Sequence, residues 1–386
     1  MKVSYLTKKI SFISHTDVIV FFFAAIFFGS LILSNISDLY LHIVYTEMMA
    51  KGELLPPPSF LYYLTVYTVV LFNANLGLLM ASGAFILALS VTAKLIVTRL
   101  FFTEIYQDIC KDSQAPAKVA SFFSLLLIVA FSLPTDTPFL GQIPPNVWHN
   151  STTIFLMPFA LAAFWLSYRQ LCEQKPNRIT LLTLICVLSL LAKPSFFMVF
   201  VIAYPLMLLK RFGFKKQLWQ NLIPVFIGFI VLVSMYYLIY FFNYGNVGGS
   251  KANVIFNPFY VWSAYSSNIP RSLLASLVFP ATYLALYPKD IFKHILLQYS
   301  VVCYLIALSI FALLSESGPR MLHGNLGWQA IVFSYILFVC SSIFFAEKIE
   351  KYGMVSWRNI VIALAFLSHI VAGIFYIKYF FQTLSL

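Results

Sequence analysis

Charge is the scarcest feature of this sequence, because only 10% of its 386 residues are Asp, Glu, Lys or Arg. An average soluble domain has about 25% charged residues and about 45–50% apolar ones, whereas 61% of this chain is hydrophobic and 18% is aromatic. Its apolar runs approach the ~20 residues that a helix needs to cross a membrane. The composition therefore predicts an all-α polytopic membrane protein, a single integral membrane domain over residues 1–386 with 11 or 12 transmembrane helices.

Several site motifs are also missing. The chain has no P-loop, no GxGxxG, no CxxC and no HExxH, so nucleotide hydrolysis and a zinc site are unsupported. The net charge of +12 comes from basic residues that flank apolar runs instead of forming one patch, which argues against nucleic acid as a partner. The five cysteines fall where we expect no disulfide, and His369 stands alone in an apolar run, as expected of a hydrogen-bonded core histidine.

The apolar runs and the basic residues together predict an orientation. Nineteen of the 25 Lys and Arg fall on one side if the N-terminus is cytoplasmic, which the positive-inside rule favours. This count places Lys94 and Arg99 in a cytoplasmic connection and leaves the charges of the chain at helix ends. The predicted spans are Val18–Ile36, Phe60–Phe72, Leu76–Ala93, Val119–Leu133, Thr152–Tyr168, Ile179–Ala192, Phe196–Leu209, Leu222–Phe242, Ser272–Tyr287, Ile295–Leu314, Trp328–Phe345 and Ile360–Ile377.

One pair of these spans conflicts with that orientation. If Phe60–Phe72 and Leu76–Ala93 both crossed the membrane, every later basic loop would face outward. We therefore expect one element between Phe60 and Phe102 to be a half-membrane or interfacial helix. The outer regions are then 37–59, 134–151, the Lys193-Pro194-Ser195 turn, 243–271 and 315–327, on the outside of a plasma (inner) membrane.

The first outer region predicts a short amphipathic helix along the membrane surface. Ser37 can cap its start, Gly52 suits its end, and the three prolines that follow prevent continuation. Asp38, His42 and Tyr45 share one face at helical spacing. An acid and an imidazole are thus presented near the mouth of the bundle, unless they serve only as a helix cap and a surface histidine.

This region resembles the GT-C superfamily of glycosyltransferases that use polyprenyl-phosphate sugars. The match consists of a first membrane helix that ends in an acid, then Asp38, His42, Lys51-Gly52 and Pro56-Pro57, and then an aromatic helix that opens with Phe60-Leu61-Tyr62-Tyr63. It covers about 40 residues, and the rest of the chain is similar to that family only in architecture. The family's usual acidic pair is absent beside Asp38, so a divalent metal is possible but unsupported.

The resemblance implies a function for the outer face. A sugar would move with inversion from a polyprenyl-(pyro)phosphate donor to a glycan or lipid acceptor. Asp38 would act as the general base, with His42 beside it, and Glu47 of the same helix is a further candidate for substrate contact.

Other outer residues are candidates for substrate contact. Residues 134–151 predict a non-helical loop that gathers Asp136, Trp148, His149 and Asn150, a composition suited to a sugar or, equally, to an interfacial aromatic belt.

Cations that face outward are few. Lys193 interrupts two short apolar runs at a depth where an ionisable group is expensive, so we expect it to meet a lipid phosphate. Arg320 and His323 form a second candidate phosphate or sugar contact, and snorkelling to lipid headgroups is the alternative for each cation.

Two other functions stay open. A lipid-linked polysaccharide polymerase would also use outer-face cations, but only Arg271 and Arg320 are available as arginines. A lipid or solute transporter or flippase would place charges in mid-membrane along a pathway.

Overall fold

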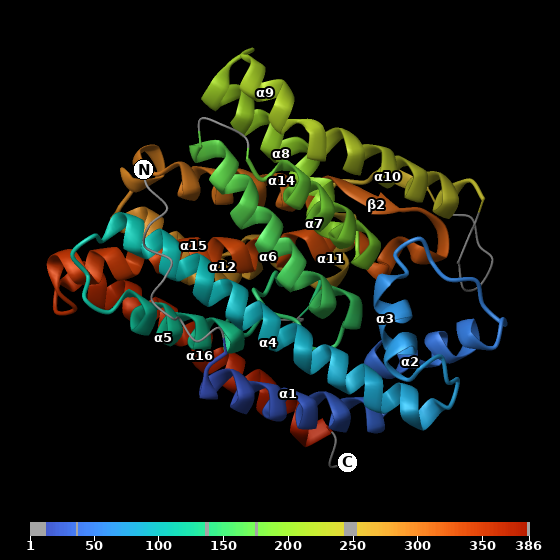
Figure 1. The fold of residues 1–386 in the computed structure, drawn as a ribbon. Helices are drawn as coiled ribbons and strands as arrows, with labels where there is room; N and C mark the ends of the chain where they lie inside the picture. The colour runs from blue at the N-terminus through green and yellow to red at the C-terminus, as the bar shows by residue number, and fades with distance from the viewer. Residues whose placement is uncertain (1–12, 36–37, 136–138, 174–176, 243–252, 384–386) are drawn as a thin grey trace.

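The computed structural model describes residues 13–35, 38–135, 139–173, 177–242 and 253–383. Its long helices run side by side in a bundle, with α2 and α3 together at one end (Figure 1). The elements in chain order are α1 (His15–Leu33), α2 (Asp38–Ala50), α3 (Leu61–Val69), α4 (Leu76–Ile109), α5 (Pro116–Val129), α6 (Ser151–Cys172), α7 (Ile179–Ala192), α8 (Ser195–Phe212), α9 (Lys216–Asn221), α10 (Ile223–Tyr240), β1 (Val254–Phe256), α11 (Tyr260–Tyr265), α12 (Ile269–Leu286), α13 (Asp290–Lys293), α14 (Ile295–Leu313), β2 (Leu314–Glu316), η1 (Gly318–His323), η2 (Asn325–Gly327), α15 (Trp328–Tyr352) and α16 (Trp357–Thr383).

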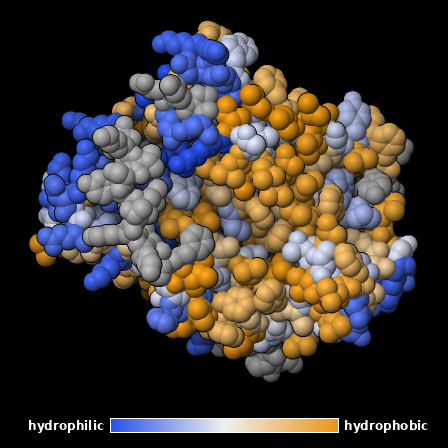
Figure 2. Space-filling view, in the orientation of Figure 1, coloured by the Kyte–Doolittle hydropathy of each residue, from blue (hydrophilic) through white to orange (hydrophobic). Residues whose placement is uncertain are grey.

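The prediction of an all-α polytopic membrane protein is confirmed. Across the described ranges, nine helical stretches are long and apolar enough to cross a membrane: α1, α4, α6, α8, α9–α10, α12, α14, η1–α15 and α16. The apolar helices α5 and α7 are shorter, with 14 residues each. Figure 2 shows hydrophobic side chains across the middle of the visible face and hydrophilic ones gathered toward its left edge.

The conflict between residues 60 and 102 is resolved by the lengths of two helices. α3 has nine residues, about 14 Å at 1.5 Å per residue, which is too short to cross a membrane. α4 has 34 residues, about 51 Å, and is one continuous helix. The expected half-length element is therefore α3.

Ion pairs between helices mark one end of the bundle, which we call the basic end. Arg99 pairs with Asp17 at 2.7 Å, Arg169 with Glu104 at 2.9 Å, and Lys348 with Asp290 at 2.8 Å. α2 and α3 lie at the opposite end (Figure 1), and α7, which leads into the turn before α8, contacts α3 there. β1 and β2 also lie there and form a two-stranded antiparallel sheet that the sequence did not predict.

The loop predicted over residues 134–151 is non-helical in its described part, residues 134–135 and 139–150, but it lies within the bundle instead of forming an outer loop. α5 ends at Val129, and residues 141–148 are all buried. The side chains and carbonyls of other helices satisfy this backbone, since Ile143 N donates to Ser276 Oγ (2.9 Å) and Phe131 N donates to His369 O (2.9 Å). Irregular backbone is tolerated at such a depth only where protein groups pair with it.

The structure corrects the predicted position of Lys94 and confirms that of His369. Lys94 is not in a cytoplasmic connection: it lies inside α4, is 7% exposed and donates to Asn146, so the charges of this chain are not confined to helix ends. His369 is fully buried and bonded to the backbone of Phe131 (2.6 Å) and Phe279 (3.2 Å), which confirms it as a core histidine.

Candidate functional site

α2 carries an exposed acid at the end of the bundle opposite the basic end. Asp38 lies in its first turn, while Leu39 and Ile43 are fully buried against the bundle. The helix ends as predicted near Gly52, whose φ of +77° is favourable only for glycine. The packing of α2 on α4 therefore leaves the carboxylate of Asp38 in contact with solvent.

His42 lies in an aromatic pocket between α2 and α3. Its ring stacks on Tyr45, 6.3 Å away, and on Tyr63, 5.7 Å away, and its Nδ1 lies 3.5 Å from the Tyr63 hydroxyl. The stacking shows that His42 and Tyr45, two of the three residues predicted to share a face, lie side by side. Burial, together with the smaller effects of the charges of Lys193 and His149, lowers the pKa of His42 to about 3. His42 is therefore neutral at physiological pH, and its ring can both donate and accept a hydrogen bond.

Lys193 occupies the turn between α7 and α8, where its ammonium is held by three oxygens. Nζ donates to Asn150 Oδ1 at 2.9 Å, to Thr153 Oγ1 at 2.8 Å and to Thr152 Oγ1 at 3.3 Å. The same nitrogen lies 4.3 Å from the centroid of the Trp328 ring. Burial lowers the pKa of Lys193 to about 7, and the negative charge of Asp38 opposes this by raising it.

The cradle of Lys193 is also the start of α6. Asn150 is the N-cap of that helix, and its Oδ1 accepts from the backbone N of Thr153 at 3.1 Å. The first turn of a helix carries a partial positive charge, so an ammonium here adds to it. A cation at a helix N-terminus makes a site suited to an anion.

His149 and Trp148 precede this cap. His149 is half-buried, and its Nδ1 has no hydrogen-bond partner in the part of the chain that the structure describes. A buried polar atom of this kind is expected to meet water or a ligand. Trp148 is 6% exposed and stacks on Phe131 (5.9 Å) and Tyr376 (5.3 Å). Its ring is part of the core, and its contact with sugar stays a prediction.

No described contact links the other predicted site residues to Lys193. Glu47 pairs with Lys51 one turn along α2, at 2.7 Å. Arg320 lies 3.7 Å from the buried Glu316, and His323 is exposed beside it in η1, so these two residues belong to the loop around β2. Asp136 lies outside the described residues.

Sequence reasoning missed part of the site. The hydroxyls of Thr152 and Thr153 accept hydrogen bonds from Lys193, and the ring of Trp328 packs against its ammonium. The run Asn150-Ser151-Thr152-Thr153 is a helix-start pattern that could have been read as polar groups at a helix N-terminus. Nothing local could have placed Trp328 beside Lys193, 135 positions earlier in the chain.

A metal ligand set is absent from the side chains that the structure describes, where no three His, Cys, Asp or Glu residues lie close enough to hold an ion. No family model matches the chain, and no curated protein is similar enough to match it. The chemistry of Asp38, His42 and Lys193 is therefore the basis for assigning a function.

Proposed function

We propose that this chain is a membrane glycosyltransferase of GT-C-like fold. It would move a sugar, with inversion, from a polyprenyl-(pyro)phosphate to a glycan or lipid acceptor on the outer face of the plasma membrane. The observation that carries this proposal is that the half-buried ammonium of Lys193 is held at the N-terminus of α6, at the same end of the bundle as the exposed acid Asp38.

The two groups suit opposite halves of a transfer reaction. Asp38 is exposed, so it can meet an acceptor hydroxyl and take its proton as the oxygen attacks the anomeric carbon. The bond between that carbon and the phosphate oxygen then breaks, and its electron pair leaves with the lipid phosphate. In this proposal, Lys193 and the N-terminus of α6 stabilise the negative charge on this leaving group.

The neutral rings beside these groups have a positioning role. His42 is uncharged at physiological pH and bonds with Tyr63, so it can orient a sugar hydroxyl without competing for the proton that Asp38 takes. His149 is near enough to Lys193 to feel its charge, and its Nδ1, which has no hydrogen-bond partner among the described residues, is free to bind a sugar hydroxyl. Arg320 and His323 are left for the acceptor or for lipid headgroups.

The test is a transfer assay with Asp38→Asn, using purified lipid-linked sugars. Loss of a general base lowers the rate by ~10²–10⁴-fold. Asparagine keeps the size of the side chain, and the cost in stability is limited to the interaction of the acid with the helix N-terminus, about 0.3–1 kcal/mol. Lipid-phosphate binding is compared at pH 6, below the pKa of about 7 of Lys193, so that the lysine stays protonated without the charge of Asp38, and it should be unchanged there.

The matched control is Glu53→Gln, which removes an exposed acid that follows α2. Both variants lose one negative charge at the same end of the bundle. Full turnover in a stable Asp38→Asn protein would contradict the proposed base. Equal loss of activity in both variants would attribute the effect to net charge.

A further inference from the structure

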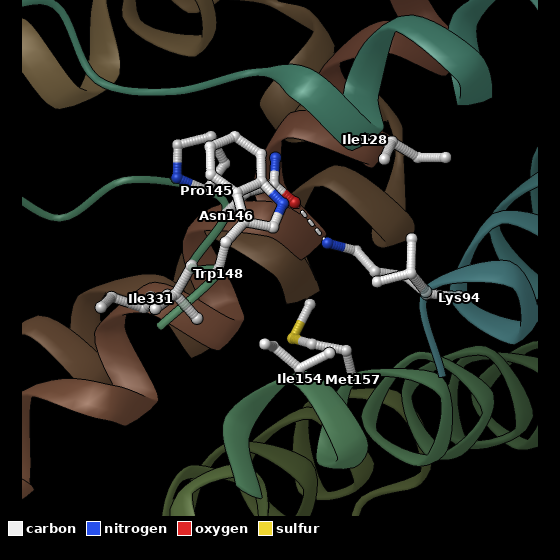
Figure 3. A pocket seen from close by; sticks show the side chains of 10 residues that line it. Lys94, Ile128, Pro145, Asn146, Trp148, Ile154, Met157 and Ile331 are labelled. Atoms are coloured by element: carbon white, nitrogen blue, oxygen red, sulfur yellow. Dashed lines mark hydrogen bonds between the residues drawn. The ribbon is translucent and has the colours of Figure 1, made fainter. Parts of the chain in front are cut away.

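A second lysine is buried deeper in the bundle. Lys94 lies within α4, five residues from Arg99 of the basic end, and is 7% exposed. Its ammonium donates to Asn146 Oδ1 and lies 3.5 Å from the centroid of the Tyr335 ring (Figure 3). No carboxylate forms an ion pair with it in the described chain. An ionisable group inside a membrane helix is costly, and the default expectation is a functional role.

The space around Lys94 is too small for a transported solute. The cavity beside it has a volume of about 20 Å³ and is lined mainly by apolar side chains, with Trp148, Ile154 and Ile331 among them. A cavity needs about 10–15 Å³ to hold one water. The ammonium of Lys94 therefore interacts with groups of the protein and not with a transported solute.

The acceptor of Lys94 is a side chain that fixes the non-helical segment. Asn146 Nδ2 donates to Leu127 O at 2.9 Å and to Ala130 O at 2.6 Å, which ties the segment to the end of α5. Its Oδ1 accepts a hydrogen bond from Lys94, so both the nitrogen and the oxygen of this buried amide are hydrogen-bonded. Figure 3 shows Asn146 and Lys94 pointing toward each other from the segment and from α4.

The same segment leads directly into the candidate site. Asn146 is followed four positions later by Asn150, which receives Lys193 and starts α6. Trp328 and Tyr335 are seven residues apart on α15, two helical turns, and so face the same way. Lys193 lies over Trp328 and Lys94 over Tyr335, so the segment is held between two ammonium groups along one face of α15.

We propose that Lys94 is a positioning residue: its hydrogen bond to Asn146 holds residues 139–150 so that Asn150 and the start of α6 meet Lys193. Its effect on turnover rests on the proposed function. Its effect on the segment does not, because that depends only on the bond between Lys94 and Asn146.

The test compares Lys94→Met with Lys94→Gln in the full-length protein. Methionine has a similar length and no donor, and the removal of a buried charge offsets part of the stability lost with the hydrogen bond. It leaves Asn146 Oδ1 without a partner, and we expect faster hydrogen exchange in residues 139–150 and roughly tenfold weaker binding of undecaprenyl phosphate. Glutamine can still donate to Asn146 and should restore most of both.

The control is Thr98→Val, one turn further along α4, which removes the contact between Thr98 Oγ1 and the Tyr335 hydroxyl (3.1 Å) but leaves the segment alone. Its exchange in residues 139–150 should match that of the wild type. If Lys94→Met does not accumulate, Lys94→Leu removes the same donor while keeping all bonds donated by Asn146, and it should loosen the same segment.

Unchanged exchange in Lys94→Met would overturn the inference, and so would equal loosening in Lys94→Gln, because the bond would then not be what matters. If the wild type itself binds no undecaprenyl phosphate, the proposed function fails, and the exchange data alone decide the role of Lys94. Faster exchange in Lys94→Met with rescue by Lys94→Gln would support it in either case.

Discussion

Replacing Lys193 by methionine should weaken the binding of a lipid phosphate far more than it weakens the fold. Hydrogen bonds to charged groups contribute about 1.5–3 kcal/mol, which corresponds to roughly 10- to 150-fold in affinity at 1.4 kcal/mol per factor of ten. The cost to the fold is small, because Asn150 Oδ1 keeps the backbone N and the hydroxyl of Thr153 as donors after Lys193 is removed.

The affinity for a lipid phosphate should also depend on pH through the ionisation of Lys193. The pKa of Lys193 is lowered to about 7, so the free site loses its positive charge as the pH rises through that value. Binding of an anion then requires uptake of a proton, and affinity should fall by up to about tenfold per pH unit above 7. Lys193→Arg stays charged over this range, so its affinity should not follow that fall.

The assay is binding of undecaprenyl phosphate to purified protein between pH 6 and 9. The ionisation of the lipid phosphate is common to all variants, so the ratio of wild type to Lys193→Arg isolates the lysine. Arg271→Met, which removes an exposed cation at the same end, is the matched control. Equal affinity of wild type and Lys193→Met at pH 6, or parallel pH profiles for wild type and Lys193→Arg, would refute the reasoning.

Two further predictions concern the fold and its orientation. Arg99→Met leaves Asp17 buried without its bidentate partner and should lower the free energy of unfolding by about 3–5 kcal/mol. The double variant Arg99→Met/Asp17→Asn should recover much of this loss. Equal thermal stability of the single and the double variant would contradict the importance of the Arg99–Asp17 ion pair. On intact cells, after replacement of the exposed Cys172, an impermeant maleimide should label Glu53→Cys and spare Lys215→Cys, and the reverse pattern would invert the orientation.

Features that depend on short stretches of chain were within reach of the sequence. The apolar runs predicted the helices because a span needs only enough consecutive apolar residues to cover the membrane. The charge conflict after Phe60 predicted that one element there is not a crossing, and α3 has nine residues. The helix of Asp38 and His42 followed from helical spacing and from a glycine at its end. These properties are encoded within a few turns of chain.

The tertiary structure decided which of the polar residues meet. Lys193 was singled out by its depth, but its contacts with Thr152 and Thr153 lie about 40 positions away in the chain, and Trp328 lies farther still. Lys94 was assigned to a cytoplasmic connection, because a single charge at the edge of an apolar run is indistinguishable in sequence from the end of a helix. Only the continuation of α4 through Ile109 and the entry of residues 139–150 into the bundle make Lys94 a buried group. Contacts of this kind depend on how helices pack, and packing is set by all of their surfaces together.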